Sequence, residues 1–402
     1  MTITSEVTKP PFAKALLRRG VVAVALIGLM LIPAIILMAI TRQPSATYAA
    51  MGGLIGAIAV VAGGRRIGVV TSIVLGLLAP IAIITGLSPI TGAAVMAIMT
   101  LAVGRMSRYG LHRAVFLVPA MLAWPILSPI PWIPKGDLAK LDALLAKPGA
   151  SLSGIVGHLH ASATSGHTGH SLQEILIQQR MDTTYLTWVA LFFFIGAIIP
   201  TLLLPLVLHR AHAPTLTPHS RREAMPYTIT ITVLTAVATY YFLDHPKQAA
   251  GAFMIATILV LTQVGMDIEW SVTLQRVLGT LGGLFLTFGV MALIGANSFT
   301  QVFGMPFPLK LYIVGIVFGM AAIMLKFNSK QWPYYLLMTP TTALLNAYTT
   351  SQVISLGRQR VTDNLVGAVL VILAGLITVG TNRFLKQPAD EHAVVAPPAT
   401  PA

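Results

Sequence analysis

Residues 44–76 read PSATYAAMGGLIGAIAVVAGGRRIGVVTSIVLG, and this stretch contains the pattern that decides the fold class. Its two apolar runs, which extend over about 46–63 and 67–87, are separated by small residues and by the pair Arg65 and Arg66. Each run is close to the ~20 residues that cross a bilayer as a helix, and an arginine pair is typical of a short loop between two crossings. The stretch therefore predicts two consecutive membrane-spanning helices.

The same pattern continues along the whole chain of 402 residues, of which 55% are hydrophobic and 9% are charged. The mean hydropathy is +0.80, whereas soluble domains contain roughly 25% charged residues. Further apolar runs lie at about 20–40, 88–104, 113–130, 184–208, 226–243, 248–266, 273–295, 309–326, 332–350 and 361–382. We predict an all-α, polytopic helical membrane bundle of about 12 transmembrane helices. Counts of about ten or eleven stay open because several runs are short.

The basic residues predict the orientation of the bundle. Lys and Arg number 26 against 12 Asp and Glu, and most of them lie in short clusters between apolar runs. With the N-terminus inside, the clusters around Arg65, Arg105 and Arg221 face the cytoplasm, and Arg358 and Arg360 are the main exceptions. This predicts a multi-pass protein of the inner membrane whose basic residues contact anionic lipid. Because no long basic stripe is interleaved with aromatic residues, we expect no nucleic-acid partner.

Several kinds of chemistry are excluded by what the sequence lacks. Without cysteine there is no disulfide framework, thiolate metal site or thiol nucleophile. No G-x-x-x-x-G-K-[ST] motif occurs, so we expect no ATPase on this chain. We find no catalytic triad and no paired carboxylates, and therefore predict no enzymatic activity and no cofactor. The first apolar run exceeds the hydrophobic region of a signal peptide, so we expect a retained helix.

Two longer connections predict how the chain is divided. Residues 1–208 form the first membrane half, which includes an external loop at 131–183 that is rich in Gly, Ser and His. Residues 209–225 form a cytoplasmic linker, and residues 226–386 form the second half. Residues 387–402 are rich in Pro and Ala and are expected to be disordered.

The external loop contains four histidines, at His158, His160, His167 and His170. Imidazole groups bind transition metals. However, these histidines include no pair at helical i, i+4 spacing and have no cysteine nearby. We therefore favour a flexible loop and predict no metal site.

The two predicted halves show weak self-similarity, which is the mark of an internal repeat. The segment PKQAAGAFMIATILVLTQVGMDIEWSVTLQRVLGTLGG, from Pro246, matches the stretch from Pro44. Both run from proline through a small-residue helix to an arginine that precedes a glycine, so that Arg66 corresponds to Arg276. We predict two repeats of about six helices, related by an axis along the membrane normal, with a pathway between them. The alternative is that apolar sequences of low complexity resemble one another by chance.

Two later segments, LQRVLGTLGGL at 274–284 and GRQRVTDNLVGA at 357–368, carry a family resemblance. The chain resembles the fusaric acid resistance (FUSC) family, related to aromatic acid exporters, over roughly 226–383. Its R-x-x-G-T-x-x-G motif corresponds to Arg276, Gly279, Thr280 and Gly283. Its R-x-x-D-T-x-x-G motif corresponds to Arg360, Asp363 and Gly367, with Asn364 in place of Thr. Many members carry large soluble cytoplasmic domains between or after their membrane halves, whereas this sequence shows only the short segment 209–225 between the halves. The resemblance implies export of small, often aromatic, carboxylic acids or similar toxic compounds.

Candidate substrate-binding residues are Arg276, Arg66, Thr341, Thr342 and Asn346. A guanidinium group offers a fixed fork of donors to a carboxylate, and neighbouring glycines permit close backbone approach. The alternative is that the arginines contact lipid headgroups while the glycines pack helices. The hydroxyl and amide groups of the later helix line a pathway or, equally, form hydrogen bonds between helices.

Candidate residues for proton coupling are Asp363 and Arg360. An ionisable group near the start of a membrane helix is costly and often functional, and a proton-driven exporter needs a carboxylate that can change its charge. Because Asp363 follows Arg360 by three residues, the two side chains share a helical face. A simple ion pair between them is the favoured alternative.

The first functional hypothesis is a secondary exporter, driven by the proton gradient, that moves a small-molecule solute and hands it to a periplasmic adaptor. The second is a passive anion channel, for which Asp363→Asn would leave the flux intact. The third is a membrane scaffold or enzyme of the cell envelope, which would move no solute.

Overall fold

The computed structural model describes residues 12–130, 132, 178–207, 216–245, 251–262, 264, 270–294, 300–302, 305–307, 309–326, 332–345 and 350–385. The predictions made for the histidines of the external loop, for Asn346 and for the tail 387–402 lie outside the described residues. The same holds for most of the external loop.

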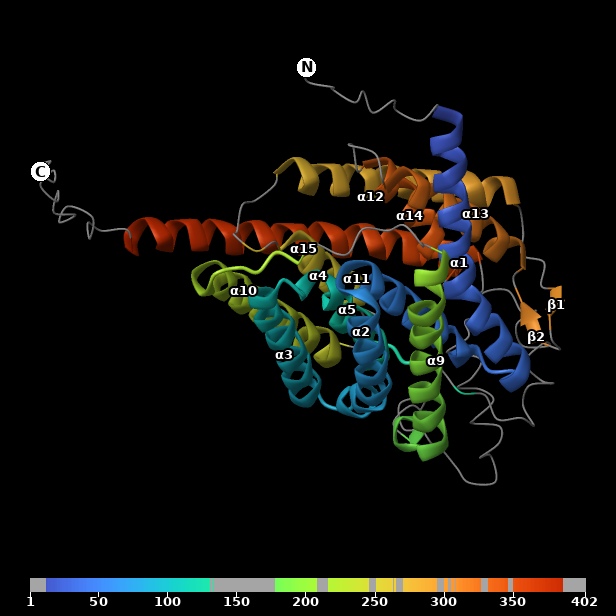
Figure 1. Ribbon diagram of the computed structural model, residues 1–402, viewed down its shortest axis with the longest axis horizontal. Helices are drawn as coiled ribbons and strands as arrows, with labels where there is room; N and C mark the ends of the chain where they lie inside the picture. Colours follow the sequence, from blue (N-terminus) through green and yellow to red (C-terminus); the bar gives the residue numbers. More distant parts are fainter. Residues whose placement is uncertain are drawn as a thin grey trace, which may run out of the picture.

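Each predicted apolar run contains a helix (Figure 1). The first part of the chain contains α1 (Phe12–Thr41), η1 (Pro44–Thr47), α2 (Tyr48–Thr85), α3 (Pro89–Met106), η2 (Ser107–Tyr109), α4 (His112–Val115), α5 (Leu117–Leu127) and α9 (Thr183–Val207). The later part contains α10 (Arg221–Asp244), α11 (Gly251–Leu261), α12 (Trp270–Ile294), α13 (Leu309–Lys326), α14 (Trp332–Leu345) and α15 (Thr350–Leu385). The helical fold class is confirmed. It is joined by one small antiparallel hairpin of β1 (Thr300–Val302) and β2 (Met305–Phe307).

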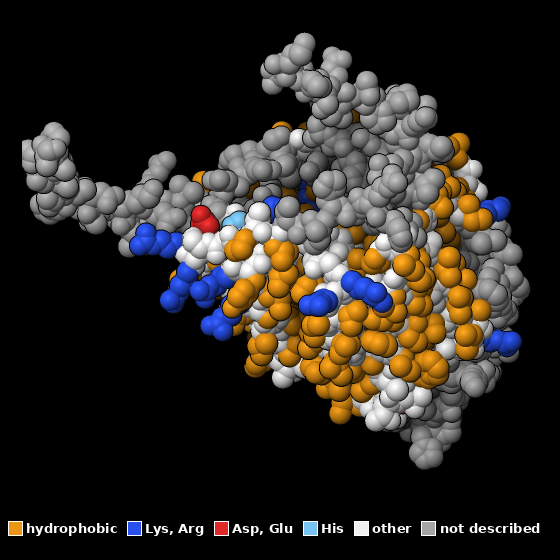
Figure 2. Space-filling model, in the orientation of Figure 1, with side chains coloured by type: hydrophobic (Ala, Val, Ile, Leu, Met, Phe, Trp, Pro, Cys, Tyr) orange, Lys and Arg blue, Asp and Glu red, His pale blue; other side chains and the backbone are white. Residues whose placement is uncertain are grey.

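Seven of the described helices are long and apolar enough to cross a membrane. Three shorter apolar helices accompany them, at His112–Leu127, Gly251–Leu261 and Lys310–Leu325. On the face that Figure 2 shows, the described surface is largely hydrophobic side chains. Among the most exposed are Ile40, Leu77, Ile98 and Leu293. The protein is therefore a multi-pass membrane protein, whereas the count of about 12 helices and the two repeats stay predictions.

Helix α2 is one of the seven, and it reverses direction at Gly64, whose φ is 83° and ψ is 172°. The two arms face each other, since a Cβ atom on Gly68 would lie 2.5 Å from the side chain of Val60. Thr201 of α9 touches both arms, because its Oγ1 donates to the carbonyl of Gly56 over 3.5 Å and lies 3.4 Å from Ser72 Oγ. A positive φ suits glycine, which explains why this residue occupies the turn. The arms are the two helices predicted on either side of the arginine pair.

Small residues bring α2 and α9 into backbone contact. A Cβ atom on Gly56 would lie 2.1 Å from the carbonyl oxygen of Ala197, and one on Gly196 would lie 2.0 Å from that of Ala49. Such close approach is the usual way in which helices associate in a lipid bilayer, where burial of apolar side chains provides little driving force.

The remaining helices pack in pairs along the bundle. Helix α10 packs mainly on α3, where Thr235 Oγ1 donates to Thr100 Oγ1 over 3.2 Å, and α11 packs on α5 and α15. Helices α12, α13 and α14 pack together, and α15 runs beside α12 (Figure 1). Two helices of the predicted second half, α10 and α11, thus pack on helices of the predicted first half.

Arg180, just before α9, connects the ends of three helices. Its Nη1 donates to the carbonyls of Ile83 and Ile126, each over 3.0 Å, close to the C-terminal ends of α2 and α5. Nearby, Tyr48 Oη accepts a hydrogen bond from the backbone N–H of Ile130, and Tyr185 Oη donates to the carbonyl of the same residue, both over 2.7 Å. The carbonyl ends of two helices therefore stabilise the buried positive charge.

We expect Arg180→Met to lower the free energy of unfolding by about 2–4 kcal/mol, because it leaves two buried carbonyls without donors. Thermal unfolding of the purified protein measures this change. The control is Arg66→Met, since Arg66 is exposed at the turn of α2. Equal melting temperatures for the two variants would contradict the prediction.

Candidate functional site

The two arginine motifs meet where α11, α12, α14 and α15 pack together. Arg276 lies on α12 and is 7% exposed. Its Nη2 donates to Thr257 Oγ1 of α11 over 3.0 Å and to Asn364 Oδ1 of α15 over 3.4 Å. Asn364 Nδ2 in turn donates to Thr280 Oγ1 over 3.4 Å, and Asn364 Oδ1 is a second acceptor within reach of the Thr257 hydroxyl. Asn364, which replaces the threonine of the motif, therefore joins the two motifs directly.

An aromatic ring lies against each of the two arginines. The Cζ atom of Arg276 lies 5.1 Å from the ring centre of Tyr335 on α14, and that of Arg360 lies 5.0 Å from the ring centre of Phe253 on α11. Arg360 Nη1 donates to Thr342 Oγ1. The faces of aromatic rings attract cations, and the attraction strengthens where water is excluded. These rings partly replace the hydration that the guanidinium groups lose.

Neither arginine forms an ion pair with a carboxylate among the described residues, whose ion pairs are His219 with Glu223 and His245 with Asp244. The Nε atoms of Arg276 and Arg360 are buried and have no hydrogen-bond partner in this part of the chain. A buried charge is costly unless it is paired and hydrogen-bonded. The two guanidinium groups also repel each other. An anion bound between them would offset both costs.

Asp363 is 6% exposed, and its Oδ2 atom is buried without a hydrogen-bond partner among the described residues. The ion pair with Arg360 that we favoured from the spacing is wrong. Arg360 instead extends its long side chain to Thr342 of α14 and Phe253 of α11. A buried carboxyl without a cationic partner is the kind of group that can take up and release a proton.

The threonines around the arginines also bond to their own helices. The hydroxyls of Thr257, Thr280 and Thr342 each donate to the backbone carbonyl four residues earlier, over 2.8 Å, 2.8 Å and 2.9 Å. Each hydroxyl oxygen can still accept a hydrogen bond from a guanidinium group. A threonine in this apolar region therefore has its hydroxyl donor satisfied by its own helix and requires no further hydrogen-bond acceptor.

The other predicted binding residues take different places. Thr341 donates to the carbonyl of Leu337 and lies against Gly319 of α13, so that only its neighbour Thr342 contacts an arginine of the motifs. Arg66 is exposed at the turn of α2, whereas its predicted repeat partner Arg276 is buried.

The glycines of the motifs pack helices. A Cβ atom on Gly279 would lie 2.6 Å from the carbonyl oxygen of Trp332, and one on Gly283 would lie 2.5 Å from that of Leu336. The contacts of these glycines are therefore those of packing residues, as in the alternative interpretation given from the sequence. Their small size brings α12 against α14 and so places Arg276 beside Tyr335.

Sequence reasoning missed Phe253 and Thr257. Both lie in an uncharged apolar run, where a single aromatic ring and a single hydroxyl give no local signal. Tyr335 was not among the predicted site residues either. Among the described residues, no group of three or more His, Cys, Asp or Glu side chains is arranged to hold a metal ion.

Comparison with known proteins adds one finding. Residues 235–374 match the family model described as fusaric acid resistance protein-like. This segment contains both arginine motifs together with Phe253 and Tyr335, so that the resemblance predicted from the motifs is confirmed there. Neither the search of curated proteins nor the search of solved structures finds a match to this chain.

Proposed function

We propose that this protein is a secondary transporter that exports small organic acids, in particular aromatic carboxylic acids and related toxic compounds, across the inner membrane. The observation that carries the proposal is the pair of Arg276, which is buried, and Arg360, which is half-buried with a buried Nε atom; neither has a carboxylate partner among the described residues. The match of residues 235–374 to fusaric acid resistance protein-like sequences supports the same class of function.

The chemistry of the site favours a carboxylate as the solute. Guanidinium groups bind carboxylates through parallel N–H donors, and the unpartnered Nε atoms of both arginines are available for such contacts. Tyr335 and Phe253 place aromatic rings beside these donors. Rings of this kind pack against an aromatic solute in offset or edge-to-face geometry, which favours aromatic over aliphatic acids.

Asp363 supplies the proposed coupling to protons. It is the buried carboxyl closest in sequence to Arg360, and uptake of a proton there removes a charge that would repel an anionic solute. A periplasmic adaptor that receives the solute is part of the same proposal. The proposal assigns no catalytic activity to the chain.

The experiment is to measure the accumulation of radiolabelled aromatic and aliphatic carboxylic acids in cells with and without the protein. We expect the protein to lower the accumulation of at least one aromatic acid, and a protonophore to abolish the effect. If no acid in a broad panel responds, a membrane scaffold or enzyme replaces the transporter as the favoured function.

Asp363→Asn separates an exporter from a passive anion channel. We expect this variant to lose export against a gradient, since an amide cannot carry the proton. The matched control is Asp244→Asn, which removes a half-exposed carboxylate at the end of α10 and should leave export unchanged. If Asp363→Asn transports as the parent does, with no effect of a protonophore on either, the channel is the better description.

A further inference from the structure

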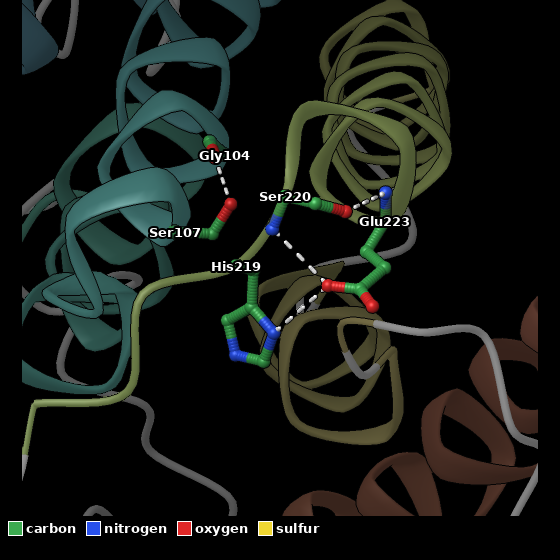
Figure 3. A network of polar contacts seen from close by, with 5 residues as sticks. All are labelled: Gly104, Ser107, His219, Ser220 and Glu223. Atoms are coloured by element: carbon green, nitrogen blue, oxygen red, sulfur yellow. Dashed lines mark hydrogen bonds and ion pairs between the residues drawn. The ribbon is translucent and has the colours of Figure 1, made fainter. Parts of the chain in front are cut away.

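The short segment 216–220, which leads into α10, is fixed against the end of α3. The backbone N–H of His219 donates to the carbonyl of Ser107 over 3.2 Å. Ser107 Oγ donates to the carbonyl of Gly104 over 2.6 Å, which anchors that residue to α3 (Figure 3). A Cβ atom on Gly110, whose φ is 73°, would lie 2.8 Å from the backbone nitrogen of Thr217. The segment is therefore held by backbone contacts at a turn that requires glycine.

The start of α10 orients the side chain of His219. Ser220 Oγ accepts a hydrogen bond from the backbone N–H of Glu223 over 3.3 Å, and Glu223 Oε2 accepts one from the backbone N–H of Ser220 over 3.1 Å. This reciprocal capping box fixes the Glu223 carboxylate. Its Oε2 also lies 3.7 Å from His219 Nδ1, so the imidazole of His219 turns one nitrogen toward a carboxylate (Figure 3).

The other nitrogen of His219 lies on the side away from Glu223, and a second histidine is next to the ring. His112, at the start of α4, is 8% exposed, and its ring centre lies 5.3 Å from that of His219 in an edge-to-face arrangement. The ring centre of Tyr227, on α10, lies 5.9 Å from that of His112. His112 Nδ1 and His219 Nε2 are both buried without a hydrogen-bond partner among the described residues.

The surroundings oppose a positive charge on His112. Burial, together with the positive charges of His219 (when protonated) and Arg113, lowers the pKa of the His112 imidazole to about 4. His112 lies outside the seven candidate membrane spans. The elements packed on α4 and α10 at this end carry further exposed arginines, namely Arg65, Arg66, Arg105, Arg108, Arg221 and Arg222. Figure 2 shows Lys and Arg side chains gathered at the left of the molecule, where α10 begins in Figure 1.

We propose that His112 and His219 form an acid-sensitive latch, which holds segment 216–220 against α3 and α4 at neutral pH and releases it when the surrounding solution is acidified. The nitrogens without hydrogen-bond partners make the latch sensitive, because a proton added to His112 lies beside a second imidazole and Arg113 and forms no ion pair with a carboxylate of the described residues. Of the two histidines, only His219 forms an ion pair with the Glu223 carboxylate. The positive-inside rule places this end of the bundle toward the cytoplasm, so the latch responds to cytoplasmic acidification.

The sign of the response follows from linkage. His112 binds a proton less readily when the segment is docked than when the ring is free at its ordinary pKa of 6.5. Docking is therefore fully stable above about pH 7 and weakens as the pH falls toward 4. If release of the segment returned His112 fully to its ordinary pKa, the docking equilibrium would fall by about fourfold at pH 6 and about thirtyfold at pH 5, and these values are the upper limits of the response.

Hydrogen exchange of the full-length protein in lipid nanodiscs at pH 7.5, 6 and 5 tests the latch. Exchange rates are corrected for the intrinsic effect of pH, with a peptide from α9 as the internal reference. We expect the protection of residues 216–224 to fall at pH 6 and more strongly at pH 5, by up to about fourfold and up to about thirtyfold, while α9 stays constant. Protection that is independent of pH after correction would overturn the proposal, and this readout does not depend on any solute.

Variants assign the effect to the two rings. In His112→Gln the corrected protection of the segment is expected to change less than twofold over the same pH range, and His219→Gln should reduce the response as well. The control is His245→Gln, whose half-exposed ring pairs with Asp244 at the other end of α10, and it should keep the full response. If His112→Gln does not fold, His219→Gln and the parent protein still decide the outcome. A response that survives in both variants would refute the latch.

Discussion

Arg276→Gln is expected to reduce export of the preferred carboxylic acid by at least about thirtyfold, because truncating one partner of a buried charged contact costs about 2–5 kcal/mol. Glutamine can keep a hydrogen bond to Thr257 or Asn364, so that the polar contacts between α11, α12 and α15 are partly preserved. The Arg276→Gln variant therefore lacks mainly the positive charge. Export is measured as the rate of loss of radiolabelled acid from preloaded cells.

Arg276→Lys and a matched control sharpen the same prediction. Lysine keeps the charge but loses the planar fork, so we expect intermediate export. The control is Arg358→Gln, which removes an exposed arginine two residues before Arg360 on α15 and should change export less than twofold. Size-exclusion chromatography shows whether each variant is folded. Equal export by Arg276→Gln and Arg358→Gln would remove the arginine pair from the proposed binding site.

The second large effect concerns the contact between α2 and α9. We expect Gly56→Leu to lower the free energy of unfolding by about 3 kcal/mol or more, because even a Cβ atom there would lie 2.1 Å from the backbone oxygen of Ala197. Backbone atoms cannot move aside as a flexible side chain can, so the two helices must separate. The expected result is a strongly lowered melting temperature or loss of the monodisperse protein.

Gly289→Leu is the control for this substitution. It adds the same side chain to a helix, α12, at a position where no heavy atom lies within 4 Å of the new Cβ atom. We expect its melting temperature to stay within a few degrees of the parent value, as is usual for a substitution without steric conflict. If both leucine variants melt alike, close packing of α2 on α9 does not determine stability.

The helices were predictable because membrane crossing imposes a length and a composition that a single sequence displays. The runs at 46–63 and 67–87 correspond to the two arms of α2, and the run at 309–326 coincides with α13. The small hairpin of β1 and β2 was not predicted, because strands of three residues carry almost no periodicity. The local sequence pattern therefore predicts where the helices lie, whereas which helices pack together depends on contacts between residues distant in sequence.

The same limit applies to the candidate site. The motifs identified Arg276, Arg360 and Asp363, because charged residues are rare in membrane helices and stand out. Spacing then suggested an ion pair, but three residues along a helix define only a shared face, and the reach of Arg360 to Thr342 depends on how α14 packs. The sequence could not choose between Thr341 and Thr342 either, since adjacent residues on a helix point about 100° apart.

In the proposed transporter, the hydrogen bonds of the site threonines affect how fast a solute can leave. A hydroxyl that already donates to its own helix stays satisfied when a guanidinium group moves away, so that the protein loses little on release. Thr342, for example, keeps the carbonyl of Met338 whether or not Arg360 contacts it. A carrier that binds tightly but releases slowly has a low turnover. In the proposed transporter, threonines at these positions would lower the energy barrier between the solute-bound and the solute-free state.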